Sequence, residues 1–394
     1  MQELTTISLK TLLHRIGVHS AGIKIMLPKG RFRVVLIRDL KPVTANILKQ
    51  ECLALGAECA LHEHSITHKV DKTHAIIMAT ESQYRRLIDN LKIQPFGLPQ
   101  IGIDLENLLF TPANTYLHMA HGQSLDLTEK TAVMGILNLT PDSFSDGGQF
   151  ISRGHALKRA EEMITEGADI IDIGGESTRP GAEAVSENEE LDRVIPVVEA
   201  LAGTVPLISV DTTKAAVAEA ALNAGAHIIN DIFGFHQSPE LAHIAAKHQA
   251  GAILMHIKGN PRTMQKNPQY DDLMGDILDW LAESIQIAVK AGLPQNHLVV
   301  DPGIGFGKTP EHNLEILRRL GELSSLKVPI LIGVSRKSFI GKIDGSHVTN
   351  RLGGSLAAAV TSVLNGASIV RVHDVKETVQ AMRMVDAISR DKHD

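Results

Sequence analysis

The sequence predicts an α/β protein in which a (β/α)8 TIM barrel follows a small N-terminal α/β domain. From residue 131 onward, short aliphatic and β-branched runs alternate eight times with longer amphipathic segments rich in Ala and Leu. These eight pairs occupy about 260 residues, the usual length of such a barrel. Polar residues follow the apolar runs, as expected where the strands of a barrel end at a shared site.

The barrel elements are expected in strict alternation along the chain. The predicted strands are residues 132–138, 169–173, 206–211, 227–230, 252–256, 298–301, 329–334 and 368–373. The predicted helices are residues 153–166, 188–202, 213–224, 239–249, 272–291, 310–321, 350–365 and 375–389. An open, doubly wound sheet is the alternative, but it seldom needs eight regular units.

The first 120 residues predict a separate accessory domain, so we expect domains at 1–120 and 121–394. Its predicted elements are a strand at 32–37, a helix at 43–56, strands at 58–62 and 75–80, a helix at 82–92 and a loop at 94–100. Four histidines, at positions 62, 64, 68 and 74, lie close together in the sequence, but no acidic or thiol partner for a metal site is placed beside them. We therefore interpret them as structural or surface residues, and the role of this domain is not predicted.

Composition narrows the functional class. Aromatic residues make up only 3% of the chain, so the core must consist of Ala, Val, Ile and Leu. The net charge of −6, with acids and bases interspersed, predicts no nucleic-acid partner and no membrane association. No membrane span or secretory signal is visible, and Cys52 and Cys59 are too few for a disulfide framework. We expect a cytoplasmic protein.

Polar residues end each of the eight predicted strands. They include Asn138, the segment 174–181, Asp211, Asn230, His256, Asp301, the segment 335–338, and Arg371 with His373. Buried polar groups cost free energy unless they are paired, so eight such strand ends together predict a functional site.

Four potential cations are expected at this end of the barrel: Arg179, Lys337, Arg371 and His373. Their convergence favours a phosphorylated or otherwise anionic substrate, because guanidinium and ammonium groups bind phosphate oxygens strongly.

The remaining polar residues favour a flat heterocycle and a magnesium ion. Asp211, Asn230 and Asp301 supply acceptors for amino and ring N–H groups, and Asn230 also supplies donors. Asn138 offers a neutral oxygen of the kind that Mg²⁺ accepts while it keeps several waters.

Beyond these residue types, nine segments resemble the dihydropteroate synthase family in order and spacing. They are residues 134–148, 172–181, 211–212, 230–231, 255–265, 301–308, 335–338, 351–358 and 371–375. The resemblance implies that 6-hydroxymethyl-7,8-dihydropterin diphosphate reacts with 4-aminobenzoate to give dihydropteroate and diphosphate, and that the enzyme is a homodimer. It covers roughly residues 131–390, and the N-terminal region lies outside it.

The resemblance also assigns roles to individual residues. The pterin would contact Asp211, Asn230, Met255, Asp301 and Lys337. The diphosphate would contact Arg371, His373 and Asn138, which would also hold Mg²⁺. The aminobenzoate pocket would comprise Thr178, Arg179, Pro180, Phe306, Lys337 and Ser338, covered by Phe144 and Asp146. Arg371, His373, Lys337 and Asp211 would carry the catalysis.

Two alternatives stay open at this point. A pterin-dependent methyltransferase would share the acceptors Asp211, Asn230 and Asp301 but would not need the cations Lys337 and Arg371. A catalytically idle barrel could bind pterin or support the N-terminal domain. Release of diphosphate separates the three, because only a synthase makes it.

Overall fold

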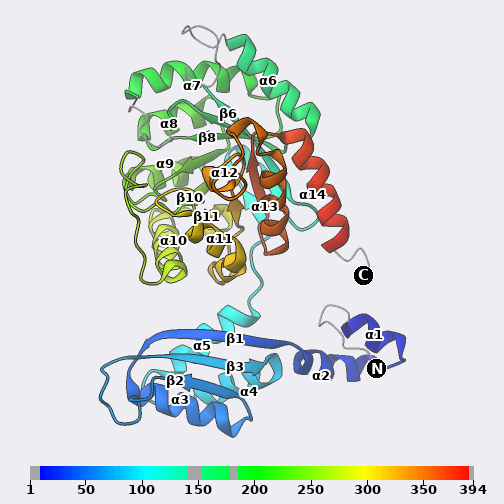
Figure 1. Cartoon of the computed structure of the whole chain (residues 1–394), viewed down its shortest axis with the longest axis vertical. Helices are drawn as coiled ribbons and strands as arrows, with labels where there is room; N and C mark the ends of the chain where they lie inside the picture. The colour runs from blue at the N-terminus through cyan, green and yellow to red at the C-terminus, as the bar shows by residue number, and fades with distance from the viewer. Residues whose placement is uncertain (1–8, 140–152, 178–184, 390–394) are drawn as a thin grey trace. The chain divides into compact units, whose positions relative to one another are not determined.

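The computed structural model describes residues 9–139, 153–177 and 185–389 (Figure 1). The chain divides into two compact units, one that extends to Pro112 and one that begins at Ala113. The boundary that we expect from the sequence, at residue 120, is eight residues downstream of this division. The intervening residues belong to a short hairpin of the second unit, which the sequence analysis did not predict.

The first unit is built on a three-stranded antiparallel sheet with the strand order β1-β3-β2. Its elements are α1 (Leu9–Arg15), α2 (Ser20–Gly30), β1 (Phe32–Leu40), α3 (Pro42–Ala54), β2 (Glu58–Leu61), β3 (Thr73–Thr80), α4 (Glu81–Leu91) and α5 (Leu98–Phe110). Alternate strand residues, such as Ala75 and Ile77, are buried in a core that they share with α3, α4 and α5. The predicted small α/β unit is therefore confirmed.

One part of this prediction is wrong, because the expected loop at 94–100 runs into helix α5. The helix begins at Leu98, directly after Gly97, whose φ of +80° is in the left-handed region. Pro99 lies in the first turn, where a helix needs no backbone N–H donor. The Pro and Gly residues that we interpreted as a loop thus mark a helix start.

The outer face of the sheet carries exposed apolar side chains. Phe32, Val34 and Leu36 of β1 and Ile76 of β3 are each at least 40% exposed, and Leu36 pairs directly with Ile76. Antiparallel sheets usually place polar residues on the face that meets water. The sequence of β1 lacks that alternation, so its pattern alone does not identify the buried face.

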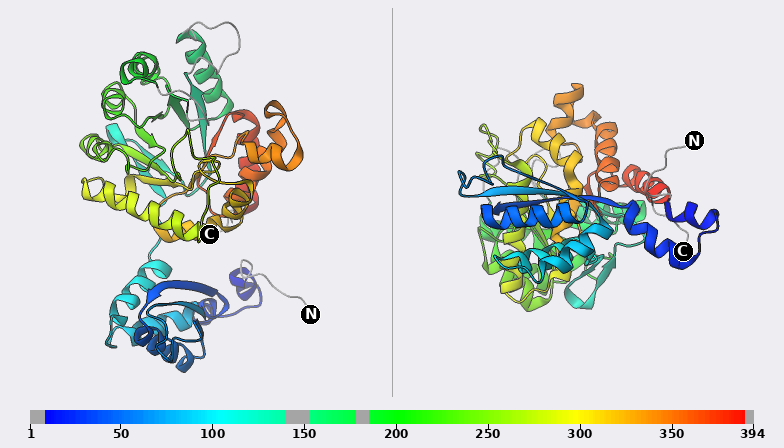
Figure 2. Two further views of the ribbon diagram at one scale, coloured as in Figure 1. Left: turned by 60° about the vertical axis from the view of Figure 1, so that its left-hand side comes forward. Right: turned by 90° about the horizontal axis from the view of Figure 1, so that it is seen from below.

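The second unit is the predicted barrel, with its helices around the strands (Figure 2). Its eight parallel strands follow the order β11-β10-β9-β8-β7-β6-β13-β12. This is the chain order around a ring, and a parallel bridge between Val300 and Ile330 joins its two ends. The predicted fold class is therefore confirmed.

The barrel elements lie close to their predicted positions. The strands are β6 (Ala132–Asn138), β7 (Ile170–Gly174), β8 (Ile208–Asp211), β9 (Ile228–Asp231), β10 (Gly251–Met255), β11 (Leu298–Asp301), β12 (Leu331–Ile332) and β13 (Ile369–Val372). The helices are α6 (Arg153–Glu166), α7 (Glu187–Leu201), α8 (Ala215–Asn223), α9 (Glu240–His248), α10 (Leu273–Lys290), α11 (Pro310–Arg319), α12 (Ser338–Asp344), α13 (Leu352–Leu364) and α14 (Val375–Ser389). Helix α12 was not predicted, and β12 is much shorter than expected. Within the described ranges, no helix has the length and apolar character needed to cross a bilayer.

A short hairpin closes the end of the barrel where the strands begin. It consists of β4 (Tyr116–His118) and β5 (Ser124–Asp126), which pair antiparallel. Leu117 and Met119 are almost fully buried against the first residues of the barrel strands. A Cβ atom added at Gly251 would lie only 3.0 Å from Met119 Cγ, which shows how closely the hairpin packs. We call residues 116–126 the floor hairpin.

Candidate active site

The predicted site residues lie where the chain leaves the barrel sheet. Asn138, Asp211 and Asp301 are the last residues of β6, β8 and β11, and Asn230 is next to last in β9. Because the strands are parallel, their C-terminal ends share one rim of the barrel. The fold therefore places these four residues at that rim, as the sequence analysis expects.

Arg371 of β13 joins two buried carboxylates. Its Nε donates a hydrogen bond to Asp172 Oδ2 at 2.6 Å, and its Nη2 donates to Asp211 Oδ2 at 2.8 Å. Asn230 Nδ2 also donates to Asp172 Oδ2, at 3.2 Å. Strands β7, β8, β9 and β13 are thus linked by one charge-assisted network, which fixes the plane of the guanidinium.

Asp172 is a site residue that the sequence analysis missed. It is fully buried inside β7, and its Oδ1 has no hydrogen-bond partner in the described structure. The signal is present in the sequence as a carboxylate between Ile171 and Ile173, because a buried charge is costly unless it is paired. We expected site residues at strand ends and on the loops that follow them, and Asp172 lies two residues before the end of its strand.

Burial and charge pairing have opposite effects on the pKa values of the charged groups in this network. Burial raises the pKa of Asp211 above its ordinary value, although Arg371 opposes the shift. Burial also disfavours the charge of Arg371, but Asp172 and Asp211 outweigh it and raise the pKa of the guanidinium. Arg371 is therefore a permanent cation whose charge is balanced by carboxylates.

Asp301 and Lys337 form a second charged group at the rim. Asp301 Oδ1 accepts the backbone N–H of Gly303 at 2.7 Å, while burial raises the pKa of its carboxyl. Burial lowers the pKa of Lys337 to about 8, against the attraction of Asp301. The Nζ of Lys337 lies 4.4 Å from the centre of the Phe306 ring, a cation–π contact. Lys337 is thus subject to the charge of a carboxylate and lies over an aromatic face.

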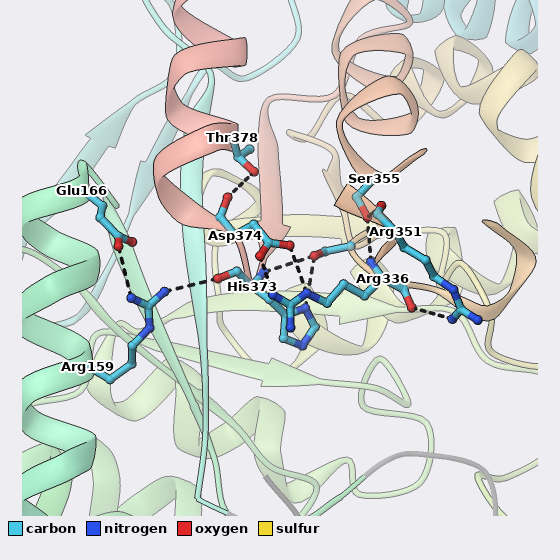
Figure 3. A network of polar contacts seen from close by, with 9 residues as sticks. Arg159, Glu166, Arg336, Arg351, Ser355, His373, Asp374 and Thr378 are labelled. Atoms are coloured by element: carbon cyan, nitrogen blue, oxygen red, sulfur yellow. Dashed lines mark hydrogen bonds and ion pairs between the residues drawn. The ribbon is translucent and has the colours of Figure 1, made fainter. Parts of the chain in front are cut away.

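A set of polar contacts fixes the chain around His373 (Figure 3). Ser335 Oγ accepts the His373 N–H at 3.2 Å and lies 3.1 Å from the ring Nδ1. Arg336 Nε donates to Asp374 at 3.0 Å, and Arg159 Nη2 donates to the carbonyl of His373 at 3.3 Å. The segments that follow β12 and β13 are therefore held together and tied to helix α6.

Arg336 has a left-handed backbone conformation, with φ of 56°. This conformation is unfavourable for a residue with a side chain, and it persists where surrounding contacts enforce it. Ser355 Oγ accepts the Arg336 N–H at 2.9 Å, and Arg351 Nη1 donates to the Arg336 carbonyl at 3.1 Å (Figure 3). Because Lys337 follows directly, these contacts set the direction in which the chain presents it.

His373 differs from the cation that we expected. Burial, together with the nearby charges of Arg371 and Arg336, lowers the pKa of its ring to about 3. The ring is therefore neutral at pH 7 in this structure. It can form hydrogen bonds to a ligand, but it adds no positive charge to that of Arg371 and Lys337.

Of the other predicted site residues, the structure describes some, while the rest lie outside the described ranges. Met255 ends β10 and belongs to an apolar cluster against which Phe306 packs, and Ser338 is the first residue of α12. Outside the described residues lie Phe144, Asp146, Thr178, Arg179 and Pro180.

The described part of the chain contains no group of three or more His, Cys, Asp and Glu residues that could hold a metal ion. Asn138 Oδ1 lies near Gly174, where an added Cβ would be 3.6 Å from it. A single neutral oxygen fits Mg²⁺ only where the substrate phosphates and water supply most of the other ligands. The donor set is therefore compatible with a magnesium ion that arrives with a diphosphate.

The barrel matches the family model described as "Pterin binding enzyme" over residues 134–373. The dihydropteroate synthase of Escherichia coli is 51% identical over 269 residues, which are 68% of this chain and 95% of that protein. The Synechocystis dihydropteroate synthase is 50% identical over 272 residues, 68% of this chain and 94% of that protein. Both matches are too short to include the N-terminal unit as well as the barrel.

A third relative covers more of the chain. A relative from Halobacterium salinarum named "Probable bifunctional folylpolyglutamate synthase/dihydropteroate synthase" is 43% identical over 380 residues, or 95% of this chain. The match spans 45% of the length of that protein. The N-terminal unit thus has a counterpart in this relative.

Solved structures resemble the barrel unit. The Yersinia pestis dihydropteroate synthase, crystallised in a sulfonamide drug complex, is 51% identical with a TM-score of 0.65. It covers 68% of this chain and 97% of its own. The Xanthomonas albilineans dihydropteroate synthase with 4-aminobenzoic acid is 41% identical, also with a TM-score of 0.65, over 70% of this chain and 99% of its own.

Proposed function

The chain belongs to the pterin-binding enzyme family and, within it, to the dihydropteroate synthases, transferases of folate biosynthesis, and we propose that it joins 6-hydroxymethyl-7,8-dihydropterin diphosphate to 4-aminobenzoate. The products are 7,8-dihydropteroate and diphosphate. The observation that carries the proposal is the buried set of acceptors at the barrel rim, which lies beside two cations, Lys337 and Arg371.

In this proposal the pterin ring lies against the acceptors. Asp211, Asn230 and Asp301 would accept its amino and ring N–H groups, since a carboxylate can take two parallel N–H bonds. Lys337 would donate to a ring acceptor, and Met255 would contact the face of the ring. Asp211, Asn230, Met255 and Asp301 lie at the ends of four neighbouring strands, and Lys337 directly precedes α12, which supports such an enclosing site.

The diphosphate would lie beside Arg371, His373 and Asn138. Arg371 supplies the positive charge, and the neutral ring of His373 supplies a hydrogen bond. Mg²⁺, held by Asn138 and the diphosphate, would neutralise part of the leaving group's charge.

The aminobenzoate would lie beside Phe306, Lys337 and Ser338. The cation–π contact between Lys337 and Phe306 supports this assignment, because it places a cation beside an aromatic wall. The family resemblance adds five further residues to this proposed pocket: Thr178, Arg179, Pro180, Phe144 and Asp146.

The reaction breaks the carbon–oxygen bond at the pterin methylene. Arg371 stabilises the negative charge that develops on the departing diphosphate, and the electron-rich dihydropterin shares the positive charge left on carbon. The carboxylates of Asp211 and Asp172 favour that positive charge electrostatically. The amine of 4-aminobenzoate then forms the new carbon–nitrogen bond and loses a proton, so no protein nucleophile is needed.

Diphosphate release tests the proposal. Purified protein would receive pterin diphosphate, Mg²⁺ and 4-aminobenzoate, with each omitted in turn. We expect release that depends on all three. Release without 4-aminobenzoate would indicate hydrolysis, and pterin binding without any release would contradict the synthase assignment for this chain.

We also propose that the protein is a cytoplasmic homodimer. An apolar recess of about 300 Å³ between α11, α12 and α13, with exposed Ile343 at its edge, supports an interface on these outer helices. Cys52 and Cys59 are buried free thiols, which fits a reducing compartment. Light scattering of the purified protein would measure its mass and test the dimer.

A further inference from the structure

Lys308, just after β11, is a buried lysine that the proposed reaction does not use. It is only 2% exposed, and its Nζ lies within hydrogen-bond distance of three acceptors. These are His256 Nδ1 at 2.8 Å, the carbonyl of Phe306 at 3.0 Å and the carbonyl of His256 at 3.4 Å. None of the three is a carboxylate. A buried ammonium without a direct counter-ion is costly, so its presence requires a physical explanation.

The contact with His256 defines the state of that ring. When Lys308 is charged, its ammonium has donors only, so Nδ1 of His256 accepts this hydrogen bond and carries no proton. Burial and the charge of Lys308 lower the pKa of His256 to about 2, which agrees with this requirement. The backbone N–H of His256 donates to the carbonyl of Asp301 at 2.9 Å. The pair of Lys308 and His256 is therefore connected to the last residue of β11.

Two glycines let the loop of Lys308 lie directly on the chain that follows β10. Gly303 and Gly307 both have positive φ. An added Cβ would lie 2.0 Å from the carbonyl oxygen of His256 at the first position, and 2.4 Å from that of Lys258 at the second. The backbone of residues 301–308 thus has little conformational freedom where it packs against the chain after β10. Lys308 adds hydrogen bonds between these two segments.

The charged neighbours of Lys308 are Asp301 and Lys337. Burial lowers the pKa of Lys308 to about 7, with Asp301 acting against the shift and Lys337 adding to it. In the other direction, the positive charge of Lys308 lowers the pKa of Asp301. Tyr270, which donates to the carbonyl of Gly307 at 2.8 Å, has a raised pKa and stays neutral. Lys308 is therefore charged below pH 7 and largely neutral well above it.

We propose that Lys308 is a positioning residue, whose hydrogen bonds hold Phe306 beside Lys337 and whose buried charge acts on Asp301, the acceptor for the N–H groups of the pterin. This inference rests on the proposed function, in which Asp301 is a pterin acceptor. The two contributions depend differently on pH. The charge acts only where Lys308 is protonated, whereas the hydrogen bonds persist in the neutral amine.

The test is the affinity for 6-hydroxymethylpterin, measured by calorimetry between about pH 5.5 and 9 on the full chain. K308M removes both the charge and the donors, and K308Q removes the charge but keeps a donor. We expect K308M to bind about tenfold more weakly than wild type near pH 6, because Asp301 is more easily protonated when the charge of Lys308 is absent. The ratio of the K308M dissociation constant to that of the wild type should shrink steadily above pH 7, where wild-type Lys308 is itself neutral.

Two further variants serve as controls. H256Q keeps an acceptor for Lys308 and should retain most of the affinity. K290M removes an exposed lysine at the end of α10 and should leave binding unchanged at every pH. K308Q also lacks the charge, so its loss of affinity should likewise shrink above pH 7, and the test remains decisive even if K308M folds poorly.

The outcomes separate the inference from the proposed function. If the wild type binds the pterin and K308Q loses affinity equally at every pH, the role of the charge is overturned. The same holds if K308Q loses no affinity at all. Failure of the wild type to bind the pterin at any pH contradicts the proposed function itself. A loss of affinity in both variants that is largest below pH 7 and shrinks above it supports both.

Discussion

Arg371 donates to two carboxylates and must also contact diphosphate in the proposed reaction. A guanidinium has five N–H donors, and the contacts with Asp172 and Asp211 use Nε and Nη2. The remaining donors can reach a diphosphate without loss of either ion pair. Asp172 therefore orients Arg371 from a position that the substrate need not touch.

Replacement of Arg371 by alanine tests this arrangement. We expect turnover to fall on the order of 10²-fold or more, because the charge that stabilises the departing diphosphate is lost. R371K should restore only part of the rate, since one ammonium cannot serve both carboxylates in a fixed plane. Steady-state kinetics would measure both variants, and near-normal turnover of R371A would exclude its assigned role.

The pKa of Lys337 predicts how activity depends on pH. Its pKa is lowered to about 8, so the cation is present below that pH and is lost as the pH rises through it. If Lys337 binds substrate as a cation, kcat/KM should decrease above about pH 8. K337R should move this decrease to higher pH, because arginine stays charged. An alkaline limb that is identical in both proteins would assign it to another group.

At the scale of elements, periodicity predicted the parts of the chain that repeat. Strands β6 and β11 have the predicted bounds, because each is a run of aliphatic residues that ends in a polar one. The floor hairpin and α12 escaped prediction because each strand of the hairpin has three residues and α12 only seven, too few to show a period. β12 is short because Pro329 lacks a backbone N–H donor and because the chain soon reaches Arg336, whose backbone is in the left-handed conformation.

Only part of the candidate site could likewise be predicted from the sequence. The acceptors Asp211, Asn230 and Asp301 could be found because each ends a predicted strand. Asp172 leaves a signal, a carboxylate within an aliphatic run, but its partners and those of Lys308 could not be predicted, since they depend on which strands and loops are neighbours in space. The neutral state of His373 likewise depends on its burial beside Arg371, which residue identity does not reveal.

The loop after β11 offers a test of backbone requirements. We expect G303A to lower the free energy of unfolding by at least about 2 kcal/mol, because the residue has positive φ and its Cβ would meet a backbone carbonyl. G353A is the matched control, in an exposed position of α13 where nothing lies within 4 Å. It should stabilise the protein by about 0.5–1 kcal/mol, as expected for Gly to Ala in a helix. Urea unfolding would compare them, and equal stabilities would refute the packing argument.

At the scale of the whole molecule, the barrel unit contains its own core and the described part of the proposed site. The bacterial relatives match 68% of this chain over 94–95% of their own length. The N-terminal unit has a separate core, drawn from α3, α4, α5 and their sheet. Its role could not be predicted, because its described residues gather no comparable set of buried charged groups.

Two truncations test this division. A fragment of residues 113–394 keeps the floor hairpin, and we expect it to fold and to release diphosphate at a rate within a few-fold of the full chain. A fragment of residues 131–394 lacks the hairpin and exposes the apolar residues that Leu117 and Met119 cover. It should lose several kcal/mol of stability, as for deletion of large buried side chains. Equal melting temperatures of the two fragments would show that the hairpin is dispensable.

The floor hairpin also has a consequence for synthesis of the protein on the ribosome. Its buried residues leave the exit tunnel before any barrel strand, yet they pack against residues as distant as Leu331 and Ile369. Leu117 and Met119 must therefore wait, exposed to water or to a chaperone, while more than two hundred residues are translated. At about 5–20 residues per second, this interval lasts on the order of ten seconds or more. Closure of the barrel floor is thus a late, long-range event, although the segment that performs it is among the earliest of the barrel unit to be made.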